Sequence, residues 1–261
     1  MFDRTELDRA LTGTIFAGHL HYLSETGSTN ADALAGALTG APHGSVWLAE
    51  TQTAGRGRGD HRWHSAPGDG LYVSLLFRLK LLPGRLTLMP FSVGLATIRA
   101  MVQVAGVAVD LRWPNDLLID EKKAVGILIE AHTARNGEMQ AVAGIGINVH
   151  QHAFPPDMAT QATSLDLEAG RKISRQELLL RLLESLEQES RALEADDAGA
   201  AIPARIEAAS SWIRGRRVLV HGPQACAGVT EGLDENGFLR VRTAQGVVVV
   251  QTGGIRAAEG E

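Results

Sequence analysis

The residues best suited to chemistry in this sequence form a glycine-rich basic segment at 51–63, Thr-Gln-Thr-Ala-Gly-Arg-Gly-Arg-Gly-Asp-His-Arg-Trp. Its three alternating glycines permit sharp bends that expose backbone N–H groups. Between them, Arg56 and Arg58 add forked donors that suit phosphate or carboxylate. The segment lacks the Gly-Lys-Ser/Thr ending of a Walker loop. A basic surface turn or an RNA-contacting Arg-Gly segment is the alternative, but Trp63, on which a base can stack, favours an anion-binding loop.

A second candidate segment, 112–116, reads Arg-Trp-Pro-Asn-Asp. Pro114 fixes the backbone ahead of the polar pair Asn115 and Asp116. A carboxylate at this point can hold a magnesium ion or orient an attacking acid. A simple β-turn has the same composition and is the better-supported interpretation of this segment by itself.

Two predicted strands carry further candidates. Lys122 and Lys123 begin an otherwise apolar run, and an ammonium group that points into a cleft suits a phosphate oxygen or a substrate carboxylate. A solvated hairpin turn is the alternative for this lysine pair. Residues 144–149 read Gly-Ile-Gly-Ile-Asn-Val. Two glycines within a strand indicate either a ligand close to the backbone or tight packing, and the sequence favours neither.

Periodicity predicts the helices that must position these segments. One should begin near Thr29, because Asp32 three positions later resembles a capping box. Apolar residues at helical spacing predict another over 86–104. A second capping box at 174–177 opens a long amphipathic helix, which we expect to continue into the acidic, alanine-rich stretch 194–201.

Strands are predicted where short β-branched or apolar runs lie between turn residues. The main group comprises 45–51, 71–79, 109–111, 117–119, 125–130 and 141–149. The last four of these suit adjacent strands of one sheet. The tail adds 216–220, 228–233, 238–243 and 246–251. With an Asn236-Gly237 hairpin signal, these short strands predict a small β-barrel beyond a domain boundary near 212–215.

Composition restricts the function classes. The chain has 261 residues and a formal net charge of −5, so any positive charge that attracts a ligand must be local. The single cysteine, Cys226, excludes an intrachain disulfide. His61 with His64 and His150 with His152 lack the further ligands of a zinc site, so no metal ligand is assigned. The acidic N-terminus and the lack of a long apolar run predict a cytoplasmic protein without a membrane segment.

The order of these motifs resembles the catalytic domain of the biotin protein ligases. The series consists of Gly-Ser-Thr-Asn at 27–30, Gln52 with loop 55–59 and Trp63, Trp-Pro-Asn-Asp at 113–116, Lys123 with Gly-Ile-Leu at 126–128, and Gly-Ile-Gly-Ile-Asn at 144–148. The resemblance covers the chain from about residue 20 to its end. It implies an α+β fold with a mixed β-sheet flanked by helices, as in class II aminoacyl-tRNA synthetases. It also implies a catalytic domain at 1–212 and a small C-terminal SH3-like β-barrel at 213–261.

The resemblance implies an ATP-dependent reaction in two steps. The carboxylate of biotin attacks the α-phosphate of ATP, which gives biotinyl-5′-AMP and pyrophosphate. A lysine of a biotin carboxyl carrier protein, such as that of acetyl-CoA carboxylase, then attacks the mixed anhydride. Biotin is therefore the expected substrate, ATP and Mg²⁺ are the expected cofactors, and Mg²⁺ is expected to arrive on the ATP phosphates.

Site residues follow from the same resemblance, position by position. Catalytic roles fall to Lys123, Asp116 and Arg58, with Lys123 bridging the biotin carboxylate and the α-phosphate and Asp116 serving the acceptor lysine. Biotin binding falls to Ser28, Thr29, Asn30, Gln52, Gly55, Arg56 and Lys123. ATP and adenylate binding falls to Arg56, Gly57, Arg58, Trp63, Asn115, Lys123 and Asn148. Fixed cations suit the reaction because it joins two anions.

Other functions stay open on the sequence. A lipoate or octanoate ligase or transferase shares the fold and the type of acceptor, although the Arg-Gly loop together with Trp-Pro-Asn-Asp favours biotin. A non-catalytic nucleotide- or RNA-binding module is the rival from another class, and the net charge of −5 and the aromatic content of 5% oppose it. Only 27 residues precede the Ser-Thr-Asn motif, so we expect a monofunctional ligase that does not bind DNA. An exposed sheet edge leaves two expectations open, a homodimer or pairing with the carrier protein, and periodicity does not decide between them.

Overall fold

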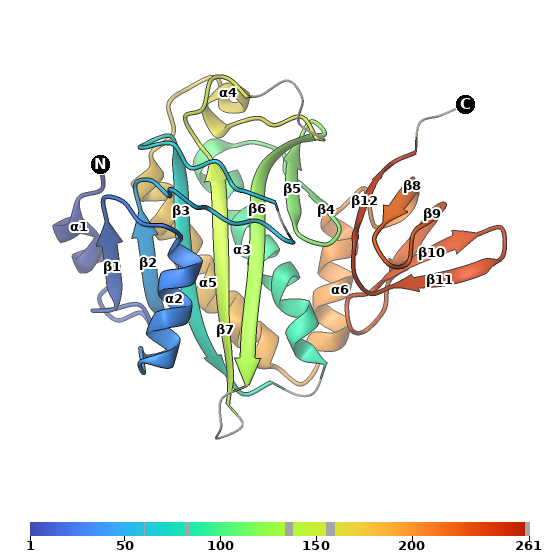
Figure 1. The fold of residues 1–261 in the computed structure, drawn as a ribbon, viewed down its shortest axis with the longest axis horizontal. Helices are drawn as coiled ribbons and strands as arrows, with labels where there is room; N and C mark the ends of the chain where they lie inside the picture. Colours follow the sequence, from blue (N-terminus) through green and yellow to red (C-terminus); the bar gives the residue numbers. More distant parts are fainter. Residues whose placement is uncertain (60, 82–83, 134–137, 155–159, 259–261) are drawn as a thin grey trace.

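The computed structural model describes residues 1–59, 61–81, 84–133, 138–154 and 160–258, and a mixed β-sheet is its largest element (Figure 1). The strands are β1 (Leu20–Leu23), β2 (Ser45–Ala49), β3 (Gly70–Leu79), β4 (Asp110–Arg112), β5 (Asp116–Ile119), β6 (Lys122–Thr133) and β7 (Met139–Asn148). Their order in the sheet is β1-β2-β3-β7-β6-β5-β4. Among these described strands β1 and β2 are parallel, and each other neighbouring pair is antiparallel.

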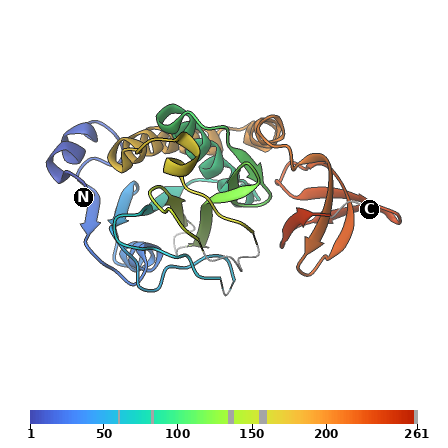
Figure 2. The same ribbon diagram turned by 90° about the horizontal axis from the view of Figure 1, so that it is seen from above.

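Helices cover both faces of this sheet, as the view from above shows (Figure 2). On one face lies α2 (Thr29–Leu38), whose Ala33 packs with Trp47, Leu76 and Val142. On the other face lie α3 (Met89–Ala105), which continues a 3₁₀ turn at Arg85–Leu88, and α5 (Arg175–Glu194). Successive residues of a strand point to opposite faces, so β3 contributes Leu76 to one layer and its neighbours to the other.

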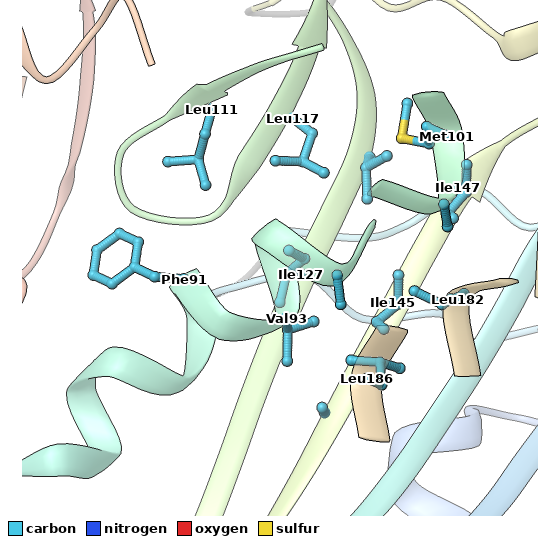
Figure 3. Packing of buried hydrophobic residues seen from close by; sticks show 14 of the residues in the cluster. Phe91, Val93, Met101, Leu111, Leu117, Ile127, Ile145, Ile147, Leu182 and Leu186 are labelled. Carbon is cyan, nitrogen blue, oxygen red and sulfur yellow. The ribbon is translucent and has the colours of Figure 1, made fainter. Parts of the chain in front are cut away.

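The larger core layer lies between the sheet and α3 with α5. Figure 3 shows side chains of both helices meeting those of the central strands. The labelled residues are Phe91, Val93, Met101, Leu111, Leu117, Ile127, Ile145, Ile147, Leu182 and Leu186. The helical stretch Arg85–Ala105 is long and apolar enough by composition to cross a membrane, but 72% of its most apolar window is buried inside the protein. We therefore assign it as a core helix.

The tail forms a second, five-stranded antiparallel sheet. Its strands are β8 (Arg214–His221), β9 (Cys226–Leu233), β10 (Leu239–Thr243), β11 (Gly246–Val250) and β12 (Gly254–Ala257), in the order β11-β10-β9-β8-β12. The four predicted tail strands are confirmed, and β12 was missed because four residues give too short a pattern. Three short helices complete the described chain: α1 (Arg4–Ala10), α4 (Leu165–Ala169) and α6 (Ala198–Ala209).

Two local predictions were wrong. The helix expected to run from α5 into 194–201 instead stops at Ala195, whose backbone is extended, and α6 begins as a separate helix. The break leaves the carbonyl oxygens of Ala195 and Asp196 free to accept hydrogen bonds from Arg85, at 3.1 and 2.6 Å. Helix α2 begins at Thr29 as predicted, but Asp32 accepts a hydrogen bond from the Thr26 hydroxyl rather than completing a capping box.

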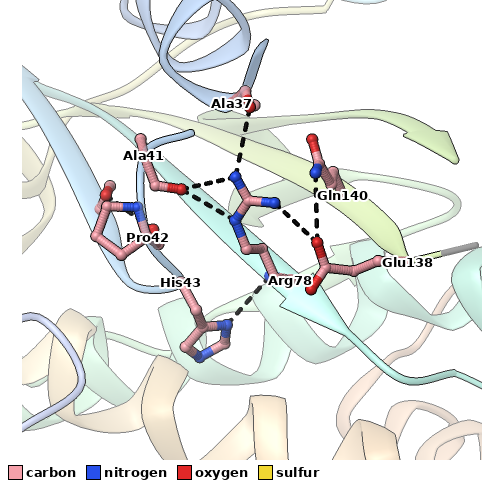
Figure 4. Close-up of polar contacts among 8 residues, drawn as sticks. Ala37, Ala41, Pro42, His43, Arg78, Glu138 and Gln140 are labelled. Atoms are coloured by element: carbon pink, nitrogen blue, oxygen red, sulfur yellow. Dashed lines mark hydrogen bonds and ion pairs between the residues drawn. The ribbon is translucent and has the colours of Figure 1, made fainter. Parts of the chain in front are cut away.

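The far end of α2 is fixed by Arg78 on β3 (Figure 4). Its guanidinium donates to the carbonyl oxygens of Ala37 (3.4 Å) and Ala41 (2.9 and 2.8 Å). Ala37 lies in the last turn of α2, and Ala41 lies just beyond its end. It also pairs with Glu138 at 2.8 Å, while the backbone N–H of Arg78 donates to His43 Nδ1 at 3.1 Å. Because carbonyl groups at a helix end lack helical partners, this arginine ties α2 to the sheet.

We expect Arg78→Met to lower the free energy of unfolding by about 2 kcal/mol, since it leaves helix-end carbonyl groups without a charged donor. Urea unfolding measures the change. Arg181→Met is the matched control, because the Arg181–Glu184 pair is solvent-exposed on α5 and should contribute less than about 0.5 kcal/mol. Equal effects of the two substitutions would contradict the role given to Arg78.

Candidate active site

A cavity of about 550 Å³ lies where the 52–63 loop, the N-terminus of α2, strands β5 to β7 and the C-terminal sheet meet. Most of the predicted site residues line it, namely Ser28, Thr29, Asn30, Gln52, Arg56, Gly57, Arg58, Trp63, Asn115, Asp116 and Lys123. Gly55 and Asn148 are not among the lining residues. Gly55 lies against the Gln52 side chain, and Asn148 donates to the carbonyl oxygens of Lys123 (3.4 Å) and Thr163 (3.0 Å) behind the cavity wall.

The centre of the cavity is an ion-pair cluster around Asp116, whose side chain is 18% exposed. Lys123 Nζ lies 2.6 Å from Asp116 Oδ1, and Arg112 Nη2 lies 2.7 Å from Asp116 Oδ2. Burial raises the pKa of the Asp116 carboxyl, but the charge of Lys123 and the hydrogen bonds from Arg112 and Lys123 outweigh it and hold this pKa below its ordinary value. Asp116 is therefore a carboxylate at neutral pH, and a weak base as long as both cations stay in place.

The backbone fixes where Lys123 points. Its N–H donates to the Gln161 carbonyl oxygen at 2.7 Å, and its carbonyl oxygen accepts from the Thr163 N–H at 3.0 Å. The register between β5 and β6 also shifts between Leu117 and Leu118, which is a β-bulge. A bulge redirects the side chains beside it, and here it brings Lys123 of β6 to the same carboxylate that β5 supplies.

Arg58 joins the basic loop to two other parts of the wall. Its Nη1 donates to Asn115 Oδ1 at 3.2 Å and to the Gly253 carbonyl oxygen at 2.9 Å. Burial lowers the pKa of the Arg58 guanidinium, and the Asp116 carboxylate opposes this shift. Asn115 is itself fixed, because its Nδ2 donates to the Ile127 carbonyl oxygen at 2.6 Å. The cis peptide between Trp113 and Pro114 precedes Asn115 directly.

A polar network forms the opposite end of the cavity. Gln52 Oε1 accepts from the N–H and the hydroxyl of Thr29, at 2.9 and 3.1 Å, and the Thr29 hydroxyl lies 2.8 Å from that of Ser74. Ser74 donates to Asn30 Oδ1 at 2.6 Å, and Asn30 Nδ2 donates to Glu130 at 2.9 Å. The hydroxyl and backbone donors named here are used within the network, but a side-chain amide carries two N–H groups. Asn30, which donates to Glu130, and Gln52, which donates to Ser65, can therefore each offer a further N–H to a polar ring.

Glu130 also restrains the first arginine of the loop. Arg56 Nη2 lies 2.5 Å from Glu130 Oε2, although the Arg56 side chain is half-exposed. The guanidinium that the sequence assigns to phosphate therefore has an internal carboxylate partner in this structure. A ligand anion must compete with Glu130 for Arg56.

Trp63 lies flat against the sheet where two glycines face it. A Cβ at Gly126 would lie 2.7 Å from the Trp63 ring, and one at Gly146 would lie 2.4 Å from its Nε1. Gly144 gives the same room to Asn30, whose Oδ1 a Cβ would approach to 2.0 Å. The strand glycines therefore serve close packing of cavity side chains. Within the described part of the chain, the buried Trp63 Nε1 has no hydrogen-bond partner.

The charge of the lining differs from that of the whole chain. Among the described lining residues the cations are Arg56, Arg58, Arg62, Arg112, Lys123 and Arg256, and Asp116 is the carboxylate. The whole chain carries a formal charge of −5. A cleft lined by one sign of charge concentrates ligands of the other sign, so the cavity suits an anionic ligand such as a nucleotide.

Some of the lining could not be expected from the sequence. His221, Gly253, Gly254 and Arg256 come from the C-terminal sheet, far along the chain from the motifs. No spacing rule links them to the loop. His221 directly follows the predicted strand 216–220, and residues 253–256 lie at β12, which the sequence did not predict. Glu130, by contrast, ends the apolar run that starts at Lys123, so the sequence predicts its position on β6. It does not predict the contacts of Glu130 with Asn30 and Arg56.

Comparisons with known proteins agree with this geometry. The model of the biotin/lipoate A/B protein ligase family matches residues 26–148. The chain is 34% identical to a biotin–[acetyl-CoA-carboxylase] ligase of Mycobacterium tuberculosis, over 90% of this chain and 88% of that relative. It is 35% identical to the bifunctional ligase/repressor BirA of Bacillus subtilis, over 72% of this chain. This match spans 58% of the Bacillus relative's length.

Solved structures show the same α+β architecture with a mixed sheet. A biotin protein ligase from Aquifex aeolicus in complex with biotin and ATP is similar to this chain with a TM-score of 0.78. The sequence identity is 28%, and the similarity covers 92% of this chain and 100% of the Aquifex chain. The expected α+β class with a mixed sheet is thus confirmed.

Gly146→Ala tests the packing of Trp63. The added methyl group overlaps Trp63 Nε1, so we expect a loss of about 1–3 kcal/mol in the free energy of unfolding and greater quenching of Trp63 fluorescence by acrylamide. The extra quenching should vanish in a Trp63→Phe background, because the chain has three other tryptophans. Gly199→Ala in α6 is the control, since its nearest neighbour lies at an ordinary 3.4 Å. Unchanged quenching in Gly146→Ala would contradict this placement of Trp63.

Proposed function

Because the chain belongs to the biotin/lipoate A/B protein ligase family, we propose that it is an ATP-dependent biotin protein ligase. It forms biotinyl-5′-AMP from biotin and ATP and then transfers biotin to a lysine of a biotin carboxyl carrier protein. The observation that carries this proposal is the cavity in which Lys123, Arg58 and Arg112 surround Asp116, the one carboxylate among the described lining residues. The ligase relatives named above support the same substrates.

The first step needs two of the cations that line the cavity, Lys123 and Arg58. The biotin carboxylate attacks the α-phosphorus, the bond from phosphorus to the β-phosphate oxygen breaks, and pyrophosphate leaves. Two anions approach each other here, so fixed donors must offset their repulsion and follow the charge that develops on phosphate. Lys123 is the central donor, and it must turn from Asp116 toward the substrate oxygens. Arg58, anchored on Asn115 and Gly253, holds the loop side of the phosphate.

The polar end of the cavity suits the ureido ring of biotin. A cyclic urea offers one carbonyl oxygen and two N–H groups, and Thr29, Asn30, Ser74 and Gln52 form a buried network of matching donors and acceptors. The thioether ring and the methylene chain of biotin are apolar, and the apolar side chains of Leu128 and Ile145 also line the cavity. We assign the carboxylate end of biotin to the Lys123 side and the adenylate to Trp63 and Arg58.

Magnesium enters as part of the substrate, bound to ATP phosphates. The lining carboxylate Asp116 is engaged by Lys123 and Arg112, so it offers no free oxygen pair to a resident ion. Mg²⁺ keeps several waters and binds readily through phosphates with few protein ligands. The residues present therefore fit an ion that arrives and leaves with the nucleotide and pyrophosphate.

The remaining sequence predictions extend the proposal. We assign residues 1–212 to the catalytic domain and 213–261 to a C-terminal domain whose five-stranded antiparallel sheet is SH3-like. Because His221, Gly253 and Arg256 line the cavity, this second sheet takes part in the site. The cytoplasmic location, the homodimer and the absence of DNA binding stay predictions.

Pyrophosphate release from ATP and magnesium tests the reaction, with biotin, lipoate, octanoate or no acid present. We expect release with biotin and about 10²–10³-fold less in Lys123→Ala, because a donor to the reacting groups is lost. Lys122→Ala is the matched control, since Lys122 pairs with Glu168 at 3.1 Å outside the cavity and should retain full activity.

Other outcomes of this assay favour the alternatives. Release with lipoate or octanoate in place of biotin would assign the chain to the lipoate branch of the family. No pyrophosphate release with any of the acids would contradict a ligase and support a nucleotide-binding module.

A further inference from the structure

Trp212 lies at the junction between α6 and β8, and two arginines from different sheets lie over its ring. Its side chain is only 2% exposed. The guanidinium carbon of Arg216, on β8, lies 4.2 Å from the ring centre, and that of Arg112, on β4, lies 5.6 Å away. Arg216 also pairs with Glu121 at 2.9 Å. The indole thus connects the C-terminal sheet to the strand that precedes the Trp-Pro-Asn-Asp segment.

From this ring Arg112 reaches into the cavity. Arg112 is 8% exposed, and its Nη2 donates to Asp116 Oδ2 at 2.7 Å and to the Thr160 hydroxyl at 3.1 Å. A flat guanidinium can stack on an aromatic ring and direct its N–H groups along fixed lines, which an ammonium group cannot do. Arg112 therefore orients the Asp116 side chain, and Arg112 is itself positioned by Trp212, over which Arg216 of the C-terminal sheet also lies.

The two oxygens of Asp116 have different partners. Oδ2 accepts from Arg112 at 2.7 Å, whereas Oδ1 accepts from the ammonium group of Lys123 at 2.6 Å. When Lys123 turns to the substrate oxygens, Oδ1 loses this partner. Arg112 still holds the carboxylate, so Oδ1 stays oriented to accept a hydrogen bond from another ammonium group. The acceptor in the proposed transfer step is a lysine, which carries that same group.

We infer that Arg112, stacked on Trp212, is a positioning residue that fixes Asp116 through Oδ2 so that Oδ1 receives the acceptor lysine's ammonium group in place of Lys123. This inference rests on the proposed ligase function. In the transfer the ammonium group first loses one proton to solvent, and the neutral lysine nitrogen then attacks the anhydride carbonyl carbon. The bond from this carbon to the phosphate oxygen breaks, AMP leaves with the electron pair, and the nitrogen loses a second proton to solvent to give the amide.

The pH dependence of the transfer step depends on the charges around Asp116. Among the described residues, the charged or titratable groups that interact with Asp116 are Arg112 on β4, Lys123 on β6, Arg58 on the loop and His221 on β8. Burial alone raises the pKa of Asp116, and the Arg112 hydrogen bond is one of the interactions that reverse this shift. Without Arg112 this pKa rises, so the carboxylate needed to hold the ammonium group is lost at a higher pH.

Two half-reactions measured separately test the inference. The first is biotin-dependent pyrophosphate release, and the second is single-turnover transfer from enzyme-bound biotinyl-5′-AMP to a purified biotin carboxyl carrier domain. For Arg112→Met we expect transfer to fall about 10²-fold, as for a misdirected reacting group, while pyrophosphate release falls less than about threefold. The acidic limb of the transfer rate should move to higher pH. Arg112→Lys should restore the position of this limb but only part of the rate.

Arg205→Met is the matched control, since it also removes a guanidinium from a buried carboxylate, Glu189, but outside the cavity. It should change neither the ratio of the two half-reactions nor the pH limb. Equal losses in both half-reactions of Arg112→Met, or an unmoved limb in both Arg112 variants, would overturn the positioning role. No pyrophosphate release in the wild-type protein would overturn the ligase function and this inference with it.

Discussion

Burying the Lys123–Asp116 ion pair costs desolvation free energy, which neighbouring donors must offset. Arg112 supplies a second cation to the carboxylate at 2.7 Å. The backbone of Lys123 is fixed because its N–H donates to the Gln161 carbonyl oxygen and its carbonyl oxygen accepts from the Thr163 N–H. Isolated buried pairs contribute little to stability. This cluster opens into a 550 Å³ cavity, where a lysine that can leave its partner is a reactive group as well as a structural one.

The surrounding strands and loops position the charged side chains around Asp116. Strands β4, β5 and β6 are neighbours in the sheet, so they bring Arg112, Asp116 and Lys123 together although the first and last are separated by two turns. The loop contributes Arg58, and the second sheet anchors it through the Gly253 carbonyl oxygen. Glycines at 126 and 146 let Trp63 lie against the floor of the cavity. Cations from three separate parts of the chain thus converge in a protein of net negative charge.

The sequence predicted the elements with strong periodicity and the residues with unusual composition. Helices α3 and α5, the adjacent strands β4 to β7 and the convergence of the loop with Asp116 and Lys123 follow from local pattern and motif order. Other features depend on tertiary contacts that no local pattern records. Asp32 accepts a hydrogen bond from the Thr26 hydroxyl instead of capping α2. Helix α5 ends where Arg85 donates to the carbonyl oxygens of Ala195 and Asp196. The contribution of the C-terminal sheet to the cavity was also not predicted, because its lining residues lie on short, unremarkable strands.

The central claim is that Lys123 exchanges Asp116 for the anionic substrate. Calorimetric affinity for an analogue of biotinyl-5′-AMP that keeps the phosphate but has no carbonyl to attack tests it most directly, in Asp116→Asn and Lys123→Met. The account predicts that Lys123→Met weakens binding by more than about tenfold, or 1.4 kcal/mol. It predicts that Asp116→Asn binds as tightly as the wild type or more tightly, because Lys123 no longer has to leave a carboxylate. Equal losses of affinity in the two variants would contradict the exchange.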